Sequence, residues 1–208
     1  MEKISPDQNA ILNLPPAVKF ICLANLASFI ALYLLPYAAT DGLVMNIMYK
    51  LSFTPSELGF ATSYSLITHL FVHAGFLHLA VNLGMLMAMG TAIEKTLSVK
   101  KFLLLYFVTG ILAALSQALV STSGESIVGA SGAISGLLGG VIIIMHDNKI
   151  SAKNYKSFFV TVIACMAATV LFGIFGMPGV NESIAWVAHL GGFISGLLLY
   201  KPISKLTF

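Results

Sequence analysis

Six long apolar stretches cover most of the chain, and the connections between the later ones are short. None of them contains Asp, Glu, Lys or Arg, and each reaches or approaches the ~20 residues that an α-helix needs to cross a ~30 Å hydrocarbon core. The pattern predicts membrane-spanning helices over residues 20–39, 69–93, 102–123, 126–145, 157–180 and 183–200. We therefore expect an all-α, polytopic membrane protein with six transmembrane helices.

The two ends of the chain are short beside this apolar core. The first apolar stretch follows Pro15 and Pro16, and no small-residue cleavage site of the signal-peptide kind accompanies it. We expect this stretch to stay in the protein as a helix. The chain is then one membrane domain over residues 18–203, with short tails over residues 1–17 and 204–208.

The connection between the first two spans, residues 40–68, differs from the later ones. It is too long for a turn, and it holds too many apolar side chains for a loop in water. We expect this first outer loop to lie in the membrane interface. Within it, a helix start is indicated, with Thr54 as the N-cap, Pro55 at the first helical position and Glu57 completing a capping box.

The fourth span is short if its helix begins at Ser131. A helix from Ser131 to about Met145 is about 22 Å long at 1.5 Å per residue, less than the ~30 Å hydrocarbon core. Ser131 would then lie below the outer surface of the membrane. The glycine-rich residues 123–130 would enter the membrane without regular hydrogen bonds, which is tolerated only inside protein or beside a water-filled cavity. The sequence thus indicates a wet pocket around Ser131.

Composition supports the membrane assignment and orients the chain. Of the 208 residues, 58% are hydrophobic and 9% are charged, whereas about a quarter of the residues of a soluble domain are charged. The basic residues are all lysines, and in the six-span arrangement all but Lys50 fall on one side of the membrane. The positive-inside rule then places both termini in the cytoplasm. Because these flanking lysines account for the net charge of +3, no nucleic-acid partner is expected.

Four polar side chains lie within spans from which lipid should exclude them. They are His73, His78 and Asn82 in the second span and His189 in the sixth. Ionisable groups inside the bilayer are rare and usually face a cavity, a partner or a substrate path. His78 and Asn82 are four residues apart, so on a helix they share one face. We expect His69, which is nearer the interface, to lie at the surface or behind the site.

Two patterns of small residues relate the fourth span to the sixth. Glycines spaced four apart allow helix backbones to approach closely in lipid. The glycines are Gly132 and Gly136 in one span and Gly192 and Gly196 in the other. Ser131 immediately precedes the first pair, and His189 lies three residues before the second. Packing of these two faces would bring Ser131 and His189 to a similar depth near the outer side of the membrane.

Ser131 and His189 together suit nucleophilic catalysis. An imidazole beside a serine removes the hydroxyl proton as the attack begins and returns it to the leaving amine. The acids lie in outer loops or at the far membrane face, so we expect a dyad without a third, orienting acid. The oxyanion would be stabilised by the Ser131 backbone N–H, by the positive end of the helix that begins there, and by His78 and Asn82.

Other interpretations of the same residues are open at this point. Small residues alone would explain close helix packing, and Ser131 could simply cap the helix that it begins. Intramembrane histidines could also relay protons in a transporter or channel, but such a protein is expected to hold carboxylates within its spans, and these spans contain none. The lipase-type G-x-S-x-G elbow does not fit, because the segment reads Gly-Ala-Ser-Gly-Ala.

Three motifs together resemble those of the rhomboid intramembrane serine proteases. They are Gly-Ala-Ser-Gly at residues 129–132, Ala-His-Leu-Gly-Gly at residues 188–192 followed by Gly196, and the set His73, His78 and Asn82. Glu94, at the cytoplasmic end of the second span, also stands where this family tends to keep a glutamate. The resemblance implies a six-transmembrane-helix rhomboid bundle with a membrane-embedded first outer loop.

The resemblance also implies roles for the site residues. Ser131 would be the nucleophile and His189 the general base, while His78, Asn82 and the Ser131 amide would form the oxyanion hole. The fifth span and residues 176–182 would gate lateral entry of the substrate. Residues that would support the site are His73, Gly129, Gly132, Gly192 and Gly196.

The implied substrates are the transmembrane helices of single-pass membrane proteins, cut near the outer side of the membrane. Lipid surrounds the protein, no metal or organic cofactor is implied, and the sequence does not indicate an oligomeric state. The alternative is a non-proteolytic rhomboid-like protein that binds transmembrane clients, although such proteins typically lack the serine or the histidine. Size and the bare six-span core favour a bacterial inner membrane.

Two departures from the family pattern lie near the site. The position four residues after the serine, commonly aromatic in the family, is Ser135. Tyr64 and Ser65 stand roughly where the family often has a Trp-Arg pair, and the chain contains no arginine. These departures leave open how His189 is held and how the first outer loop is anchored.

Overall fold

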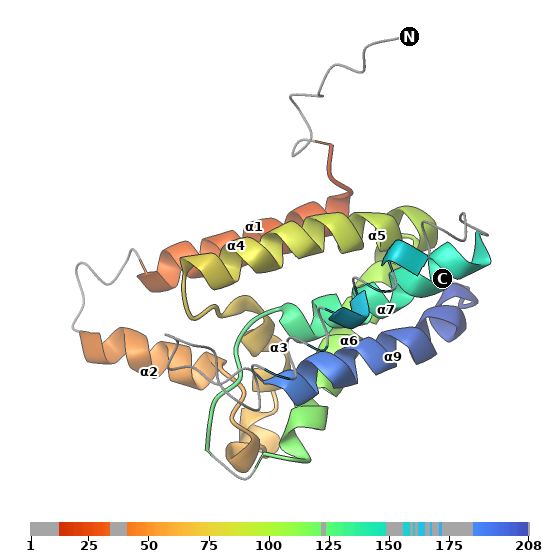
Figure 1. Ribbon diagram of the computed structural model, residues 1–208. Helices are drawn as coiled ribbons and strands as arrows, with labels where there is room; N and C mark the ends of the chain where they lie inside the picture. Colours follow the sequence, from red (N-terminus) through yellow and green to blue (C-terminus); the bar gives the residue numbers. More distant parts are fainter. Residues whose placement is uncertain are drawn as a thin grey trace.

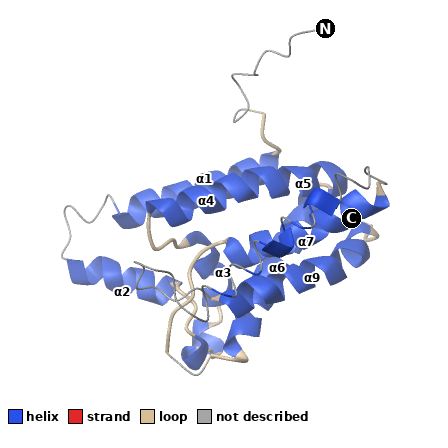
Figure 2. Ribbon diagram, in the orientation of Figure 1, coloured by secondary structure: helices blue, strands red, loops and turns tan. Residues whose placement is uncertain are grey.

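The computed structural model describes residues 13–33, 41–121, 124–148 and 185–207, together with positions 156–158, 160, 162–164, 167 and 171. Within these residues the regular structure is helical, apart from one isolated bridge between Phe53 and Ile127. The long helices lie beside one another in a bundle (Figures 1 and 2). The predicted all-α, polytopic fold is therefore confirmed.

Five long segments form this bundle. They are α1 (Pro16–Tyr33), a continuous segment made of α4 (Phe76–Met85), the π-helical turn η5 (Leu86–Gly90) and α5 (Thr91–Leu97), then α6 (Val99–Ala118), α7 (Ser131–Asp147) and α9 (Trp186–Ser204). Three of these are long and apolar enough to cross a membrane, namely α1, the Phe76–Leu97 segment and α6. The predicted fifth span lies mostly outside the described residues, so the count of six spans stays a prediction. The described positions between 156 and 171 are helical.

Helix α7 occupies the middle of the bundle. Every residue from Gly132 to Ile142 is buried, because α6, α9 and the α4–α5 segment pack around it (Figure 1). Its 17 residues give a length of about 25 Å, less than the ~30 Å hydrocarbon core. A helix this short is possible because protein rather than lipid surrounds it. The helix start predicted at Ser131 is confirmed.

Glycines allow α7 and α9 to pack backbone against backbone. A Cβ atom added at Gly192 would overlap the carbonyl oxygen of Gly132, and one added at Gly196 would overlap that of Gly136. The two pairs are in register, four residues apart on each helix. The close approach predicted from the two glycine patterns is confirmed, and it fixes the depth of α9 relative to α7.

Glu94, near the end of the second long segment, caps the start of α1. Its Oε1 accepts a hydrogen bond from the Ala17 N–H at 3.0 Å, and its Oε2 accepts one from the Val18 N–H at 2.8 Å. A helix N-terminus carries free N–H groups and a partial positive charge, so a carboxylate there is favourable. This contact explains how a buried acid is tolerated at this position.

The first outer loop is built from short helices. They are α2 (Asp41–Leu51), η2 (Pro55–Glu57), η3 (Phe60–Thr62), α3 (Ser65–Thr68) and η4 (His69–Phe71). Helix α2 extends to one side of the bundle (Figure 1), and Leu43, Met45 and Ile47 on it are exposed. Exposed apolar side chains on a helix beside the bundle are typical of a segment that lies in the lipid interface.

The predicted capping box in this loop is wrong. A helix does start at Pro55, but it is a single 3-10 turn, and Thr54 makes no side-chain cap. Instead, the Thr54 hydroxyl pairs with the Ser126 hydroxyl at 2.8 Å, because the segment before α7 runs beside it. Glu57 accepts a hydrogen bond from the Tyr49 hydroxyl, which raises the pKa of Tyr49. Both polar side chains have found partners elsewhere in the loop or beyond it.

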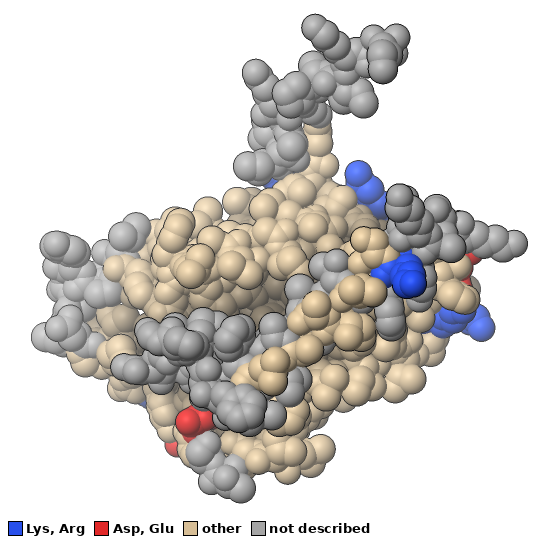
Figure 3. Space-filling model, viewed as in Figure 1, with Lys and Arg blue, Asp and Glu red and all other residues tan. Residues whose placement is uncertain are grey.

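Lysines gather at the end of the bundle that holds the start of α6 and the end of α9 (Figure 3). The Lys101 ammonium donates to the Ser204 carbonyl at 2.7 Å, and Lys201 donates to Asp147 at 3.0 Å. The bond from Lys201, with a weaker one from His146, holds the pKa of the Asp147 carboxyl below its usual value. This end of the molecule is the one that the positive-inside rule assigns to the cytoplasm.

Candidate active site

Ser131 is the first residue of α7. The cap position falls on Ala130, and no side chain caps the helix, so the interpretation of Ser131 as a capping residue is wrong. Its side chain is half-buried, and its hydroxyl makes no hydrogen bond with any residue that the structure describes. The N–H groups of a first helical turn have no partner within the helix. Ser131 thus offers an unengaged hydroxyl beside free backbone donors.

Gly129 turns the chain just before Ser131. Its φ of 105° lies in a region that side chains rarely adopt, and its N–H donates to the His69 carbonyl at 2.9 Å. The bridge between Phe53 and Ile127 holds the preceding residues, with N···O distances of 3.0 and 2.7 Å. Apart from this bridge, the described residues 124–130 form no helix or strand, as expected, and the first outer loop supplies the partners that their backbone groups do have.

His69 lies behind this turn and not at the surface. Its side chain is buried, and its Nδ1 is 2.8 Å from the Ser65 carbonyl. The ring is therefore held by the residue that stands near the family's Trp-Arg position. Of the two places expected for His69, the one behind the site is confirmed, because its own carbonyl carries the turn at Gly129.

His78 faces the same turn from α4. A Cβ atom at Gly129 would lie 2.6 Å from Nε2 of His78, so the imidazole rests directly on the glycine backbone. Asn82, one turn further along α4, is buried and donates through Nδ2 to the His78 carbonyl at 2.8 Å. One of the two N–H groups of the Asn82 carboxamide therefore binds within α4, and the second N–H remains as a donor.

His73 lies next to His78 but not on the same helix. His73 belongs to the irregular residues before α4, and the N-cap of α4 is Gly75. The expectation that His73 lies on a helix is therefore wrong. Its ring centroid is 5.0 Å from that of His78 in an edge-on arrangement, and its carbonyl accepts a bond from the Tyr33 hydroxyl at 3.0 Å. The buried ring of His73 packs behind His78.

His189 lies in the first turn of α9. Its Nδ1 is 3.1 Å from the Ala185 carbonyl, and a carbonyl oxygen can only accept a hydrogen bond. In the neutral ring the proton therefore sits on Nδ1, and Nε2 carries the lone pair. The ring is half-buried. No acid is needed to select this tautomer, because the backbone of the same helix does so.

The glycine contact brings the starts of α7 and α9 to one level. A Cβ atom at Gly132 would lie 3.8 Å from the Ala188 carbonyl oxygen, and these two residues directly adjoin Ser131 and His189. Between the Ser131 hydroxyl and His189 the structure has no hydrogen bond, and catalytic hydrogen bonds are often long in proteins without substrate.

Sequence reasoning missed two groups beside His189. One is the Ala185 carbonyl, which no side-chain pattern could reveal. The other is Gln117 on α6, whose Oε1 accepts a hydrogen bond from the Ala188 N–H at 3.2 Å. Gln117 carries the one carboxamide in the predicted span over residues 102–123, so its polarity was a usable signal.

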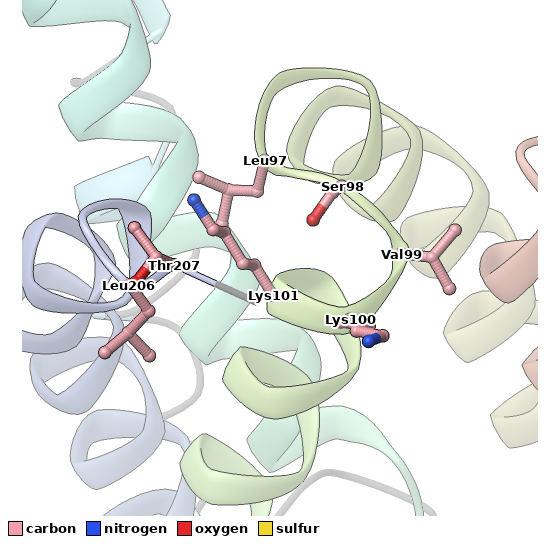
Figure 4. A pocket seen from close by; sticks show the side chains of 7 residues that line it. All are labelled: Leu97, Ser98, Val99, Lys100, Lys101, Leu206 and Thr207. Atoms are coloured by element: carbon pink, nitrogen blue, oxygen red, sulfur yellow. The ribbon is translucent and has the colours of Figure 1, made fainter.

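A cavity of about 720 Å³ lies away from these residues, at the lysine-rich end of the bundle (Figure 4). Its lining consists of residues 97–101 together with Leu206 and Thr207. The starts of α7 and α9 are at the other end of those helices, so this cavity is separate from Ser131. Among the described residues there is also no cluster of His, Cys, Asp or Glu that could hold a metal ion.

The fold and these residues define a class of protein: a multi-pass, all-helical membrane protein with a serine at the start of a short, buried helix and a histidine beside it. The Rhomboid domain family model matches residues 61–205, and the chain belongs to the rhomboid family.

Several known rhomboid proteins are similar to this chain. It is 30% identical over 177 residues to the rhomboid protease GlpG of Haemophilus influenzae, covering 85% of this chain and 88% of that protein. It is 30% identical over 156 residues to the putative rhomboid protease YdcA of Bacillus subtilis, covering 74% of each. It is 33% identical over 137 residues to RHOMBOID-like protein 5 of Arabidopsis thaliana, covering 65% of this chain but only 42% of that protein.

Proposed function

We propose that this protein is an intramembrane serine protease. Three things support the proposal: membership of the rhomboid family, similarity to bacterial proteins named as rhomboid proteases, and the arrangement around Ser131 and His189. The observation that carries it is the Gly132–Gly192 contact, which sets the free Ser131 hydroxyl and the unprotonated Nε2 of His189 at the starts of two touching helices.

The first half of the reaction makes an acyl-enzyme. Nε2 of His189 takes the hydroxyl proton of Ser131 while the oxygen attacks the carbonyl carbon of a substrate peptide bond. The resulting tetrahedral intermediate collapses, the C–N bond breaks, and the imidazolium returns its proton to the leaving amine. The acyl group of the substrate is then esterified to Ser131.

The second half releases the acyl group. Nε2 of His189, neutral again, takes a proton from water as the water oxygen attacks the ester carbonyl. Collapse of this second intermediate breaks the ester bond and returns the proton to the Ser131 oxygen. One water is consumed for each peptide bond cut, so the proposed site must admit water.

Donors near the turn at Gly129 would stabilise the oxyanion of both intermediates. The Ser131 N–H stands at the positive end of α7, His78 rests on Gly129, and Asn82 keeps one free amide N–H. Each well-placed donor of this kind typically contributes about 10²- to 10³-fold in rate. We assign the oxyanion hole to these three groups, with His73 packed behind His78 as support.

The substrates we propose are transmembrane helices of single-pass membrane proteins, cut near the outer side of the membrane. A helix must unwind locally to present a peptide bond, which is easiest beside helix-breaking residues, since broken backbone hydrogen bonds are costly in lipid. The lysine-rich end would face the cytoplasm, together with both termini. The bacterial origin of the relatives GlpG and YdcA favours a bacterial plasma membrane.

Labelling with a fluorophosphonate, which reacts with activated serines, tests the proposed site. We expect the purified wild-type protein in detergent to be labelled at Ser131, as mapped by mass spectrometry of the peptides. Ser131→Ala should abolish labelling, and His189→Ala should slow it by about 10²- to 10⁴-fold, the usual contribution of a general base. Ser195→Ala is the matched control, because the Ser195 hydroxyl bonds only its own helix, at the Gly191 carbonyl, and its labelling should equal wild type.

Labelling at another serine, or equal labelling of wild type and His189→Ala, would contradict the assignment of the dyad. Far-ultraviolet circular dichroism of each variant checks that the helical fold is retained.

A further inference from the structure

The start of α9 lacks a cap of its own. The cap position is Ala185, whose side chain carries no oxygen, and no side-chain cap bond is formed within the helix. The first helical bond runs from the His189 N–H to the Ala185 carbonyl at 3.3 Å. The N–H groups of residues 186–188 therefore need partners from outside the helix.

Gln117 supplies one of these partners from the neighbouring helix α6. Its Oε1 accepts the hydrogen bond of Ala188, and Ala188 is buried. Ala188 is the third helical residue, whose N–H is one of those that an ordinary N-cap side chain would bind. Gln117 therefore caps the N-terminus of α9 from another helix, as a serine or aspartate at position 185 would cap it from within the same segment.

The same face of α6 also contacts α7 beside Ser131. A Cβ atom at Gly132 would lie 2.6 Å from the Ala113 Cβ, and one at Gly192 would lie 3.4 Å from it. Ala113 and Gln117 are four residues apart and so share one face of α6. One helix face therefore touches the starts of both α7 and α9 and can fix their relative position.

We propose that Gln117 is a positioning residue for His189, an inference that rests on the proposed protease function. The Ala185 carbonyl that orients the imidazole belongs to the turn that Gln117 holds. Without the bond to Gln117, the buried Ala188 N–H is unpaired and the turn is free to shift. Nε2 of His189 then spends less time in line with the Ser131 hydroxyl.

Three substitutions of Gln117 test its hydrogen-bond acceptor separately from the size and length of the side chain. Gln117→Leu keeps the size and removes the acceptor, Gln117→Asn keeps the amide but is one methylene too short, and Gln117→Glu keeps both acceptor and reach. We expect the Leu and Asn variants to lose about 10- to 100-fold in kcat, as for misaligned catalytic groups, with KM within twofold of wild type. The Glu variant should retain at least a third of wild-type kcat.

The assay is cleavage of a single-pass transmembrane substrate by the full chain in liposomes, with thermal unfolding measured alongside. Equal kcat in all four proteins would overturn the inference. So would equal losses in the Leu, Asn and Glu variants, or losses that follow the unfolding temperature and raise KM, because these indicate a packing role. An inactive wild type would instead count against the protease function, and the inference would fall with it.

Discussion

At the residue scale, a backbone carbonyl orients the histidine, a role that an acidic side chain has in other serine hydrolases. The Ala185 carbonyl sets the tautomer of His189, so the dyad proposed here needs no acid to orient the imidazole as the acid of a triad does. The hydrogen bond to the Ala185 carbonyl also holds the imidazole where no aromatic side chain does so. The fourth position after Ser131 is Ser135, which is buried and too small to pack as an aromatic ring would. The chemistry therefore depends on how accurately the first turn of α9 is placed.

Gly129 provides a prediction at this scale. Gly129→Ala adds a methyl group at a φ of 105° and at 2.6 Å from Nε2 of His78, so the turn must strain and the imidazole must move. We expect activity to fall by about 10²-fold or more through displacement of an oxyanion donor. Proteolysis of a model transmembrane substrate measures this effect.

The control is Gly124→Ala in the same segment. A Cβ atom there would have Ser56 Oγ at 3.9 Å as its nearest contact, and the backbone conformation accepts a side chain. This variant should be as active as wild type. Equal activity of the two alanine variants would show that the His78 contact is unimportant.

At the scale of elements, the glycines of α7 and α9 could be predicted from the sequence because their spacing follows directly from helix geometry. The start of α7 at Ser131 could also be predicted, since the glycine-rich residues before it do not favour a helix. Partners distant in sequence could not be predicted. Thr54 pairs with Ser126, 72 residues away, and no local pattern reveals such a contact.

Close packing of α7 and α9 leads to a stability prediction. In Gly196→Ala the added methyl overlaps the Gly136 carbonyl oxygen, a backbone atom that cannot rotate away. We expect a loss of roughly 1–3 kcal/mol or more, as for other overpacked sites, seen as a lower thermal unfolding temperature in detergent.

Gly84→Ala on α4 is the matched substitution, because nothing lies within 4 Å of its Cβ position. It should leave stability unchanged or raise it by up to ~1 kcal/mol, since alanine favours helix more than glycine. Equal effects of the two substitutions would contradict the packing described for α7 and α9.

At the scale of the whole molecule, the membrane class and the long helices could be predicted from hydropathy alone. The irregular backbone at His73, before α4, and the cap that Gln117 gives to α9 could not be predicted, because each depends on how helices meet. Gln117 was detectable as a polar residue in an apolar stretch, but its partner was not. The positions and depths of single helices are thus more predictable than the contacts between them.

The positions of the lysines predict the orientation of the whole chain. Alkaline phosphatase is active only outside the cytoplasm, so a fusion truncated after Gly124, beyond the third span, should be active in bacterial cells. A fusion after Thr207 should be inactive, because an even number of spans returns the chain to the lysine-rich side. An active fusion after Thr207 would show that the span count is odd or the orientation is reversed.

Cleavage itself is the most direct test of the central claim that Ser131 makes this protein an intramembrane protease. Purified wild type and Ser131→Ala are each reconstituted in liposomes with a single-pass substrate, and the fragments are mapped by mass spectrometry. We expect wild type to cut within or beside the transmembrane helix and Ser131→Ala to be inert. Equal cleavage by both proteins, or a folded wild type that cuts none of several substrates and binds them intact, would contradict the account and favour a non-proteolytic, client-binding rhomboid.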